Sequence, residues 1–66
     1  MNKSMRGKIA EKAVDEWLKG RMFEDDTKQM FKDYFCDGMV IADIAKKYDR
    51  TRQLIWLKLD RCPWAK

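Results

Sequence analysis

The sequence predicts a small all-α domain, a bundle of about four helices. Apolar residues recur at helical spacing in successive segments, and no segment alternates between apolar and polar residues as a half-buried strand would. Glycine and proline residues stand where these segments end. A chain of 66 residues forms one domain, so we treat residues 1–66 as a single unit, and its hydrophobic content of 45% excludes a disordered chain.

The first predicted helix runs from about Ser4 to Lys19, with Ser4 as its N-cap and Gly20 as the left-handed residue that ends it. Its apolar side chains form two neighbouring i,i+4 rows. These rows are Met5, Ile9, Ala13 and Trp17, and Ala10, Val14 and Leu18. We expect residues 1–21 to cover the core of the following helices. The alternative is that Trp17 and its neighbours form the seam of a homodimer.

The second predicted helix begins at residues 25–27, where acidic side chains favour the positive end of a helix, and ends at Asp37 before Gly38. Its inward face consists of Met30, Phe31, Tyr34 and Phe35. The acidic residues 24–26 are explained by their place at the helix start. Alternatively, they repel phosphates and orient the domain on DNA, or they contact a basic protein partner.

The last two predicted helices, Val40–Tyr48 and Thr51–Arg61, are separated only by Asp49 and Arg50. Asp49 tolerates the left-handed backbone that so short a turn needs. Pro63 prevents the final helix from continuing. Two short helices joined by such a turn are typical of a helix-turn-helix.

Apolar spacing supports this motif. Ile44 points into the crossing of the two helices, and Ala45 is small enough for the second helix to approach its backbone. Thr51 is a good N-cap, while Ile55 and Leu59 lie one turn apart on a single face. We therefore treat residues 26–62 as a three-helix DNA-binding unit.

With that face buried, the first two turns of the last helix project polar residues outward, as a recognition helix does in the major groove. Arginine pairs with guanine and glutamine with adenine. The predicted base-reading residues are Thr51, Arg52, Gln53 and Trp56. Trp56 is ambiguous, because an indole at this position could equally pack against the protein.

Residues 27–62 resemble the three-helix DNA-binding units of DNA invertases and resolvases, and of small plasmid repressors of the KorA (TrfB) type. In these families an Ile-Ala or Phe-Ala pair precedes a turn that ends in Thr-Arg or Ser-Arg, and this chain has Ile44-Ala45 and Thr51-Arg52. Many members carry glycine and an aliphatic residue where this chain has Asp49 and Arg50. The resemblance implies major-groove recognition by the helix that starts at Thr51.

Positive charge is concentrated near the proposed reading helix. The net charge is +4, but residues 46–66 contain seven basic and two acidic residues, whereas the remainder contains eight basic and nine acidic ones. Basic side chains neutralise phosphates and release counterions. The predicted phosphate contacts are Lys46, Lys47, Arg50, Lys58 and Arg61. The alternative for Lys46 and Lys47 is that they only keep a helix surface soluble.

Catalytic and metal chemistry are poorly supported. The chain has no histidine, a single serine and no glycine-rich phosphate loop, so we expect neither an enzyme nor a bound cofactor or metal. Cys36 and Cys62 lack zinc-site spacing and are expected to be reduced thiols, with a disulfide as the alternative. The sequence has no membrane-length apolar run and no secretion signal, which favours a cytoplasmic protein without membrane contact.

These features predict a transcriptional regulator that binds double-stranded DNA, specifically a small repressor of phage or plasmid type. One short unit contacts few bases, so a homodimer on a palindrome is expected. The alternative function is a protein-interaction module of the same shape that docks on transcription machinery or another regulator. Leu54, Trp56 and Leu57 would then anchor the partner.

Overall fold

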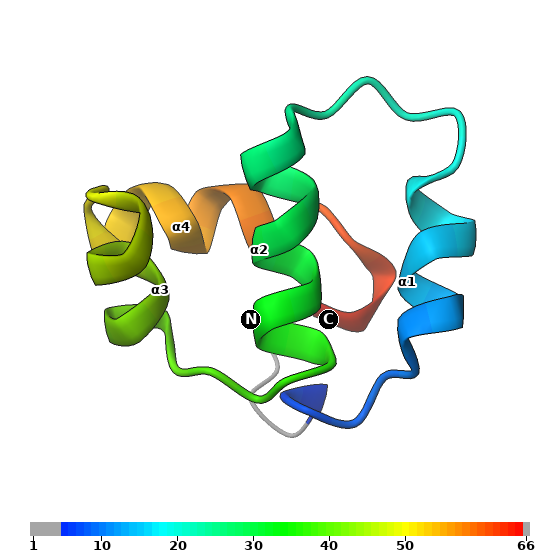
Figure 1. Ribbon diagram of the computed structural model, residues 1–66, viewed down its shortest axis with the longest axis horizontal. Coiled ribbons are helices and arrows are strands. Elements are labelled where there is room, and N and C mark those ends of the chain that lie inside the picture. Colours follow the sequence, from blue (N-terminus) through cyan, green and yellow to red (C-terminus); the bar gives the residue numbers. More distant parts are fainter. Residues whose placement is uncertain (1–4, 66) are drawn as a thin grey trace.

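The computed structural model describes residues 5–65, and this part of the chain folds into four α-helices without a strand (Figure 1). The helices are α1 (Glu11–Leu18), α2 (Asp25–Phe35), α3 (Ile41–Tyr48) and α4 (Arg52–Leu59), and a short 3₁₀ turn, Pro63–Ala65, follows them. The predicted fold class, a small all-α bundle of about four helices, is confirmed.

Helix α2 is the centre of the fold. It packs against each of the other three helices, with α1 on one side and α3 and α4 on the other (Figure 1). Its inward face is the one predicted from spacing: Met30, Phe31, Tyr34 and Phe35 are all buried. This apolar stripe supplies much of the core, because each large side chain removed from water contributes about 1.5–3 kcal/mol.

Aromatic side chains join α1 and the C-terminal turn to this core. The Trp17 ring lies 5.2 Å from Phe31 and 5.7 Å from Trp64, between ring centroids. Trp64 also lies 5.6 Å from Phe35, and Phe23 lies 5.4 Å from Phe31. Trp17 therefore packs inside its own chain, as the covering role of the first helix predicted, and Trp64 folds back on the core.

The predicted start of the first helix is wrong. The spacing predicted a helix from about Ser4, whereas α1 begins at Glu11; the N-cap predicted at Ser4 lies outside the described residues. Gly7 interrupts the pattern with a left-handed backbone (φ +71°). The predicted left-handed residue after the helix is confirmed at Gly20, where φ is +80°.

The segment before α1 is held by the end of α2. The Gly7 N–H donates to the Tyr34 carbonyl oxygen at 3.0 Å, and the Ile9 N–H donates to the Phe35 carbonyl oxygen at 2.9 Å. Helix C-termini leave carbonyl groups without partners inside the helix. The N–H groups of residues 7 and 9 bond to two of these carbonyl groups and so hold the segment against the end of α2. Helical periodicity is a local signal and could not predict these contacts.

Helix α2 ends at Phe35, two residues before the predicted Asp37, and Gly38 beyond it has φ +77°. Helix α3 then has no side-chain cap, and its N-cap residue Val40 has extended backbone. The last predicted helix reaches Arg61, but α4 ends at Leu59. These boundary differences leave the predicted faces of the helices unchanged.

Helices α3 and α4 meet through the residues that spacing assigned to their contact. Ile44, Ile55 and Leu59 are fully buried, and Ala45 is nearly so. Asp49 adopts the predicted left-handed conformation (φ 54°, ψ 49°), which turns the chain between the two helices.

Both ends of this turn are hydrogen-bonded. The Arg50 N–H donates to the Ala45 carbonyl oxygen at 2.9 Å. The Leu54 N–H donates to the Thr51 hydroxyl at 3.2 Å, so Thr51 is the N-cap of α4, as predicted. Arg50 itself is exposed, so its side chain does not replace the aliphatic residue found there in the families that this chain resembles.

The two cysteines are separate thiols, with Cys62 buried and Cys36 half-buried. The Cys62 thiol donates to the Leu59 carbonyl oxygen at 3.2 Å, and burial raises the pKa of Cys36 above its ordinary value. Within residues 5–65, no helix has the length and apolar character that crossing a membrane requires.

Candidate nucleic-acid interface

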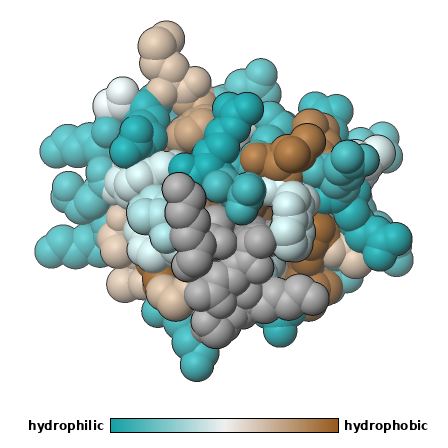
Figure 2. Space-filling view, turned by 180° about the vertical axis from the view of Figure 1, so that it is seen from behind, coloured by the Kyte–Doolittle hydropathy of each residue, from teal (hydrophilic) through white to brown (hydrophobic). Residues whose placement is uncertain are grey.

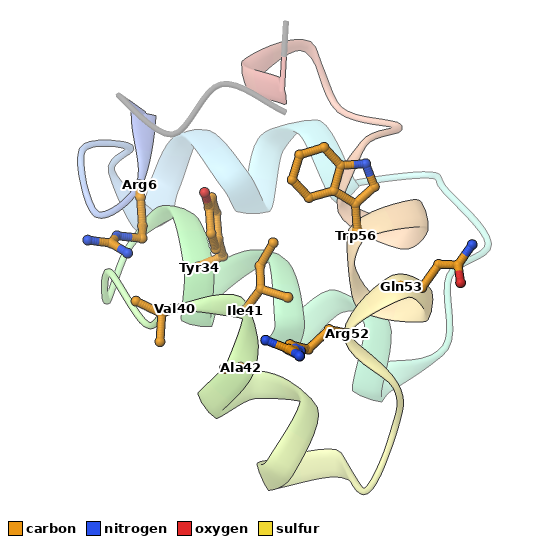
Figure 3. A pocket seen from close by; sticks show the side chains of 8 residues that line it. All are labelled: Arg6, Tyr34, Val40, Ile41, Ala42, Arg52, Gln53 and Trp56. Atoms are coloured by element: carbon orange, nitrogen blue, oxygen red, sulfur yellow. The ribbon is translucent and has the colours of Figure 1, made fainter.

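The first two turns of α4 present the predicted base-reading residues to solvent. Arg52 and Gln53 are exposed, and Trp56, one turn later, retains 37% of its surface. Figure 3 shows Arg52 directed towards the start of α3, while Gln53 extends away from it on the other side of α4. Thr51 differs from these three, because its hydroxyl already accepts the capping hydrogen bond.

A surface groove collects Arg52, Gln53 and Trp56 together with residues from three other segments. We call it the α3–α4 groove; it is lined by Arg6, Tyr34, Val40, Ile41, Ala42, Arg52, Gln53 and Trp56 (Figure 3). Arg6 comes from the segment before α1, and Val40 to Ala42 form the start of α3. Sequence reasoning missed Arg6, because its position depends on the backbone hydrogen bonds that tie residues 7 and 9 to α2.

Next to this groove, the turn between α3 and α4 carries further positive charge. A shallow hollow there is lined by Ala42, Ala45, Lys46, Asp49, Arg50 and Arg52. Two predicted phosphate contacts, Lys46 and Arg50, therefore share a surface with the predicted base reader Arg52. Asp49 is the acidic residue of this surface.

Lys47 points elsewhere. Its Nζ atom lies 3.0 Å from Oδ2 of Asp33 on α2, in an ion pair with a carboxylate that is 1% exposed. The hydrogen bond to Asp33 raises the pKa of Lys47 above its ordinary value. The ammonium group predicted to contact phosphate therefore already has an anionic partner within the protein.

Asp33 is the buried carboxylate that joins α2 to α3. It accepts hydrogen bonds from Gln29 Nε2 at 3.1 Å and the Tyr48 hydroxyl at 2.8 Å, as well as from Lys47. Burial alone raises the pKa of Asp33, but the hydrogen bonds from Gln29, Lys47 and Tyr48 outweigh it and hold that pKa below its ordinary value. A charged Asp33 thus fixes α3 in place. The sequence indicated this role only through the position of Asp33, an acidic residue within the apolar stripe of the second predicted helix.

The two remaining predicted phosphate contacts lie on another side of α4. Lys58 and Arg61 line a small groove with Phe23, Thr27, Leu54 and Leu57. Lys58 Nζ lies 3.4 Å from the Thr27 hydroxyl oxygen at the start of α2. The structure therefore does not bring Lys58 and Arg61 together with Arg52 and Arg50.

Apolar residues on α4 are partly open to solvent. Leu57 is 55% exposed, Trp56 is 37% exposed and Leu54 is half-buried. Trp56 forms part of the wall of the α3–α4 groove, so its side chain is neither fully buried nor fully exposed. Figure 2 shows hydrophobic areas on the rear face as separate regions among hydrophilic residues.

Comparison of the chain with protein-family models, with curated proteins and with solved structures gives no match. The functional interpretation therefore depends on the chemistry and geometry of the chain itself.

Proposed function

We propose that the protein binds duplex DNA sequence-specifically, with α3 and α4 acting as a helix-turn-helix and α4 lying in the major groove. One observation carries this proposal: Arg52 and Gln53 stand exposed on the first turn of α4, and Arg52 shares a surface hollow with Lys46 and Arg50. The first turn of a recognition helix is the part that reaches base edges.

The chemistry of this surface suits a duplex. The guanidinium of Arg52 can donate two hydrogen bonds to O6 and N7 of guanine, and the carboxamide of Gln53 can pair with N6 and N7 of adenine. Trp56 offers apolar contact to thymine methyl groups. Lys46 and Arg50 contact phosphates, which position the protein without reading sequence.

Such a protein acts as a small transcriptional regulator. We propose a repressor of phage or plasmid type that binds a palindrome as a homodimer, because one α4 helix contacts too few bases for strong discrimination. The resemblance to invertase, resolvase and KorA-type DNA-binding units supports this role.

Substitution of the base-reading residues tests the proposal. The probe is a duplex carrying the DNA immediately upstream of the protein's own gene, compared with a scrambled duplex. Arg52→Ala and Gln53→Ala are each expected to reduce discrimination between the two by about 1–3 kcal/mol. Lys12→Ala on the exposed face of α1 is the control and should preserve discrimination. A folded Arg52→Ala variant with the discrimination of the wild type would refute the assignment.

A second candidate function is supported by the exposed apolar residues of α4. In that case the protein docks on transcription machinery or another regulator through Leu54, Trp56 and Leu57, of which Leu57 is 55% exposed. Trp56→Ala would then abolish partner binding, whereas Arg52→Ala would leave it intact. Leu54 and Leu57 line one groove and Trp56 lines another, so the three do not form a single apolar surface, which makes DNA the preferred proposal.

A further inference from the structure

A nearly buried hydroxyl opens into the α3–α4 groove. Tyr34 is 2% exposed, and among the described residues its hydroxyl has no hydrogen-bond partner. Within this part of the chain, every fully enclosed polar side-chain atom has a partner, so the Tyr34 oxygen must be reachable from the groove. Figure 3 shows it at the end of the groove where Arg6 lies. The Tyr34 hydroxyl can therefore donate a hydrogen bond to a ligand that enters the groove.

Arg6 is held at this end of the groove by its neighbours. The Gly7 and Ile9 N–H groups bond to carbonyl oxygens at the end of α2, so the backbone on one side of Arg6 is fixed. Gly7 also lies so close to the α2–α3 connection that an added Cβ would be 3.1 Å from the Gly38 Cα. Among the described residues, the exposed Arg6 guanidinium has no ion-pair partner.

We propose that Arg6 and the Tyr34 hydroxyl form a binding site for a backbone phosphate of duplex DNA at the start of α3. The inference rests on the proposed function. When a recognition helix occupies the major groove, the preceding helix crosses the DNA backbone. The start of α3, beside Arg6, is therefore where a phosphate passes.

The lining of the groove favours an anion of this kind. Arg6 and Arg52 stand at its two sides, and the lining contains no acidic residue. The first N–H groups of α3, at Ile41 and Ala42, belong to a helix end that attracts anions and lacks intrahelical acceptors. A phosphodiester accepts hydrogen bonds from all these donors, and Val40, which is 39% exposed, offers an apolar contact for the adjoining deoxyribose.

Two substitutions separate this site from the base-reading residues. Arg6→Ala is expected to weaken binding to every duplex alike and to reduce the slope of log K against log salt by about one. Tyr34→Phe removes only the hydroxyl and is expected to weaken binding about 13- to 160-fold, the value of one hydrogen bond to a charged group, without changing the slope. Lys8→Ala is the control, because Lys8 is exposed in the same segment but does not line the groove.

Fluorescence anisotropy with a duplex of arbitrary sequence measures the binding affinity and its salt dependence for each variant. Circular dichroism confirms that each variant is folded. In ¹⁵N-labelled protein, the same duplex should shift the amide signals of Ile41 and Ala42, and Arg6→Ala should suppress those shifts. Inorganic phosphate alone should leave them unchanged at matched ionic strength. If it reproduces the shifts, the site binds free phosphate and the inference is overturned.

The failure of this inference is distinguishable from the failure of the proposed function. Normal affinity and slope in Arg6→Ala and Tyr34→Phe, together with lost discrimination in Arg52→Ala, would reject the phosphate site alone. If wild-type protein fails to bind any duplex at low salt, both proposals are rejected.

Discussion

The substitution Asp33→Asn tests whether a charged carboxylate holds α3 on α2. It preserves the shape of the side chain but removes the charge that accepts hydrogen bonds from the Tyr48 hydroxyl and Lys47 Nζ on the same oxygen. A hydrogen bond to a charged group contributes about 1.5–3 kcal/mol. We assign that value to the Tyr48 bond and none to Lys47, whose side chain is 46% exposed and screened by solvent.

The free energy of unfolding at pH 7 should therefore fall by about 1.5–3 kcal/mol. For a domain of this size, that lowers the melting temperature by roughly 6–24 °C. Thermal unfolding followed by circular dichroism measures the change, with Asp37→Asn as the control because Asp37 is exposed. A decrease no larger than that of the control would refute the structural role of Asp33.

The pH dependence gives a second check. The pKa of Asp33 is lower in the folded protein than its ordinary value. Its stabilising effect is therefore fully present above that ordinary value, about 3.9, and is lost as the pH falls through the lower folded pKa. The stability difference between wild type and Asp33→Asn should shrink progressively below about pH 4. A difference that stays constant down to pH 2 would show that the charge of Asp33 is not responsible.

Four further substitutions test the elements around the groove, each by thermal or urea unfolding. Thr51→Ala should cost about 1 kcal/mol because it removes the cap of α4; an unchanged stability would mean that the capping bond contributes nothing. Gly7→Ala should cost at least about 1–2 kcal/mol, since it forces alanine into a left-handed backbone and places its Cβ 3.1 Å from Gly38; a neutral effect would contradict the close approach of the two segments. Ile55→Ala should cost about 2–5 kcal/mol while Leu57→Ala should cost much less, and equal losses would contradict the orientation of α4.

Much of the fold could be predicted because it is encoded in local spacing. The inward stripe of α2, the Thr51 cap and the left-handed Asp49 each depend on residues within one or two helical turns. The start of α1 could not be predicted in this way. Gly7 and Ile9 donate to carbonyl groups of α2 that are more than twenty residues away in the chain, and these bonds compete with continuation of the helix.

The candidate site was predictable to a lesser extent for the same physical reason. Exposure of Arg52 and Gln53 follows from the burial of Ile55 and Leu59 on the same helix. The direction of a long basic side chain depends instead on partners that only the folded chain provides. Lys47 reaches Asp33, fourteen residues earlier, and Lys58 reaches Thr27, thirty-one residues earlier. Neither partner is visible in local charge patterning.

Sequence-specific binding of this protein to duplex DNA can be tested with a randomised pool of duplexes from which the wild-type protein enriches a sequence. Fluorescence anisotropy then compares the enriched duplex with a scrambled one at several salt concentrations. Salt-dependent binding with a preference of about 10³ or more for the enriched duplex is expected. Equal affinity for the two duplexes, or no binding to either at low salt, would contradict it.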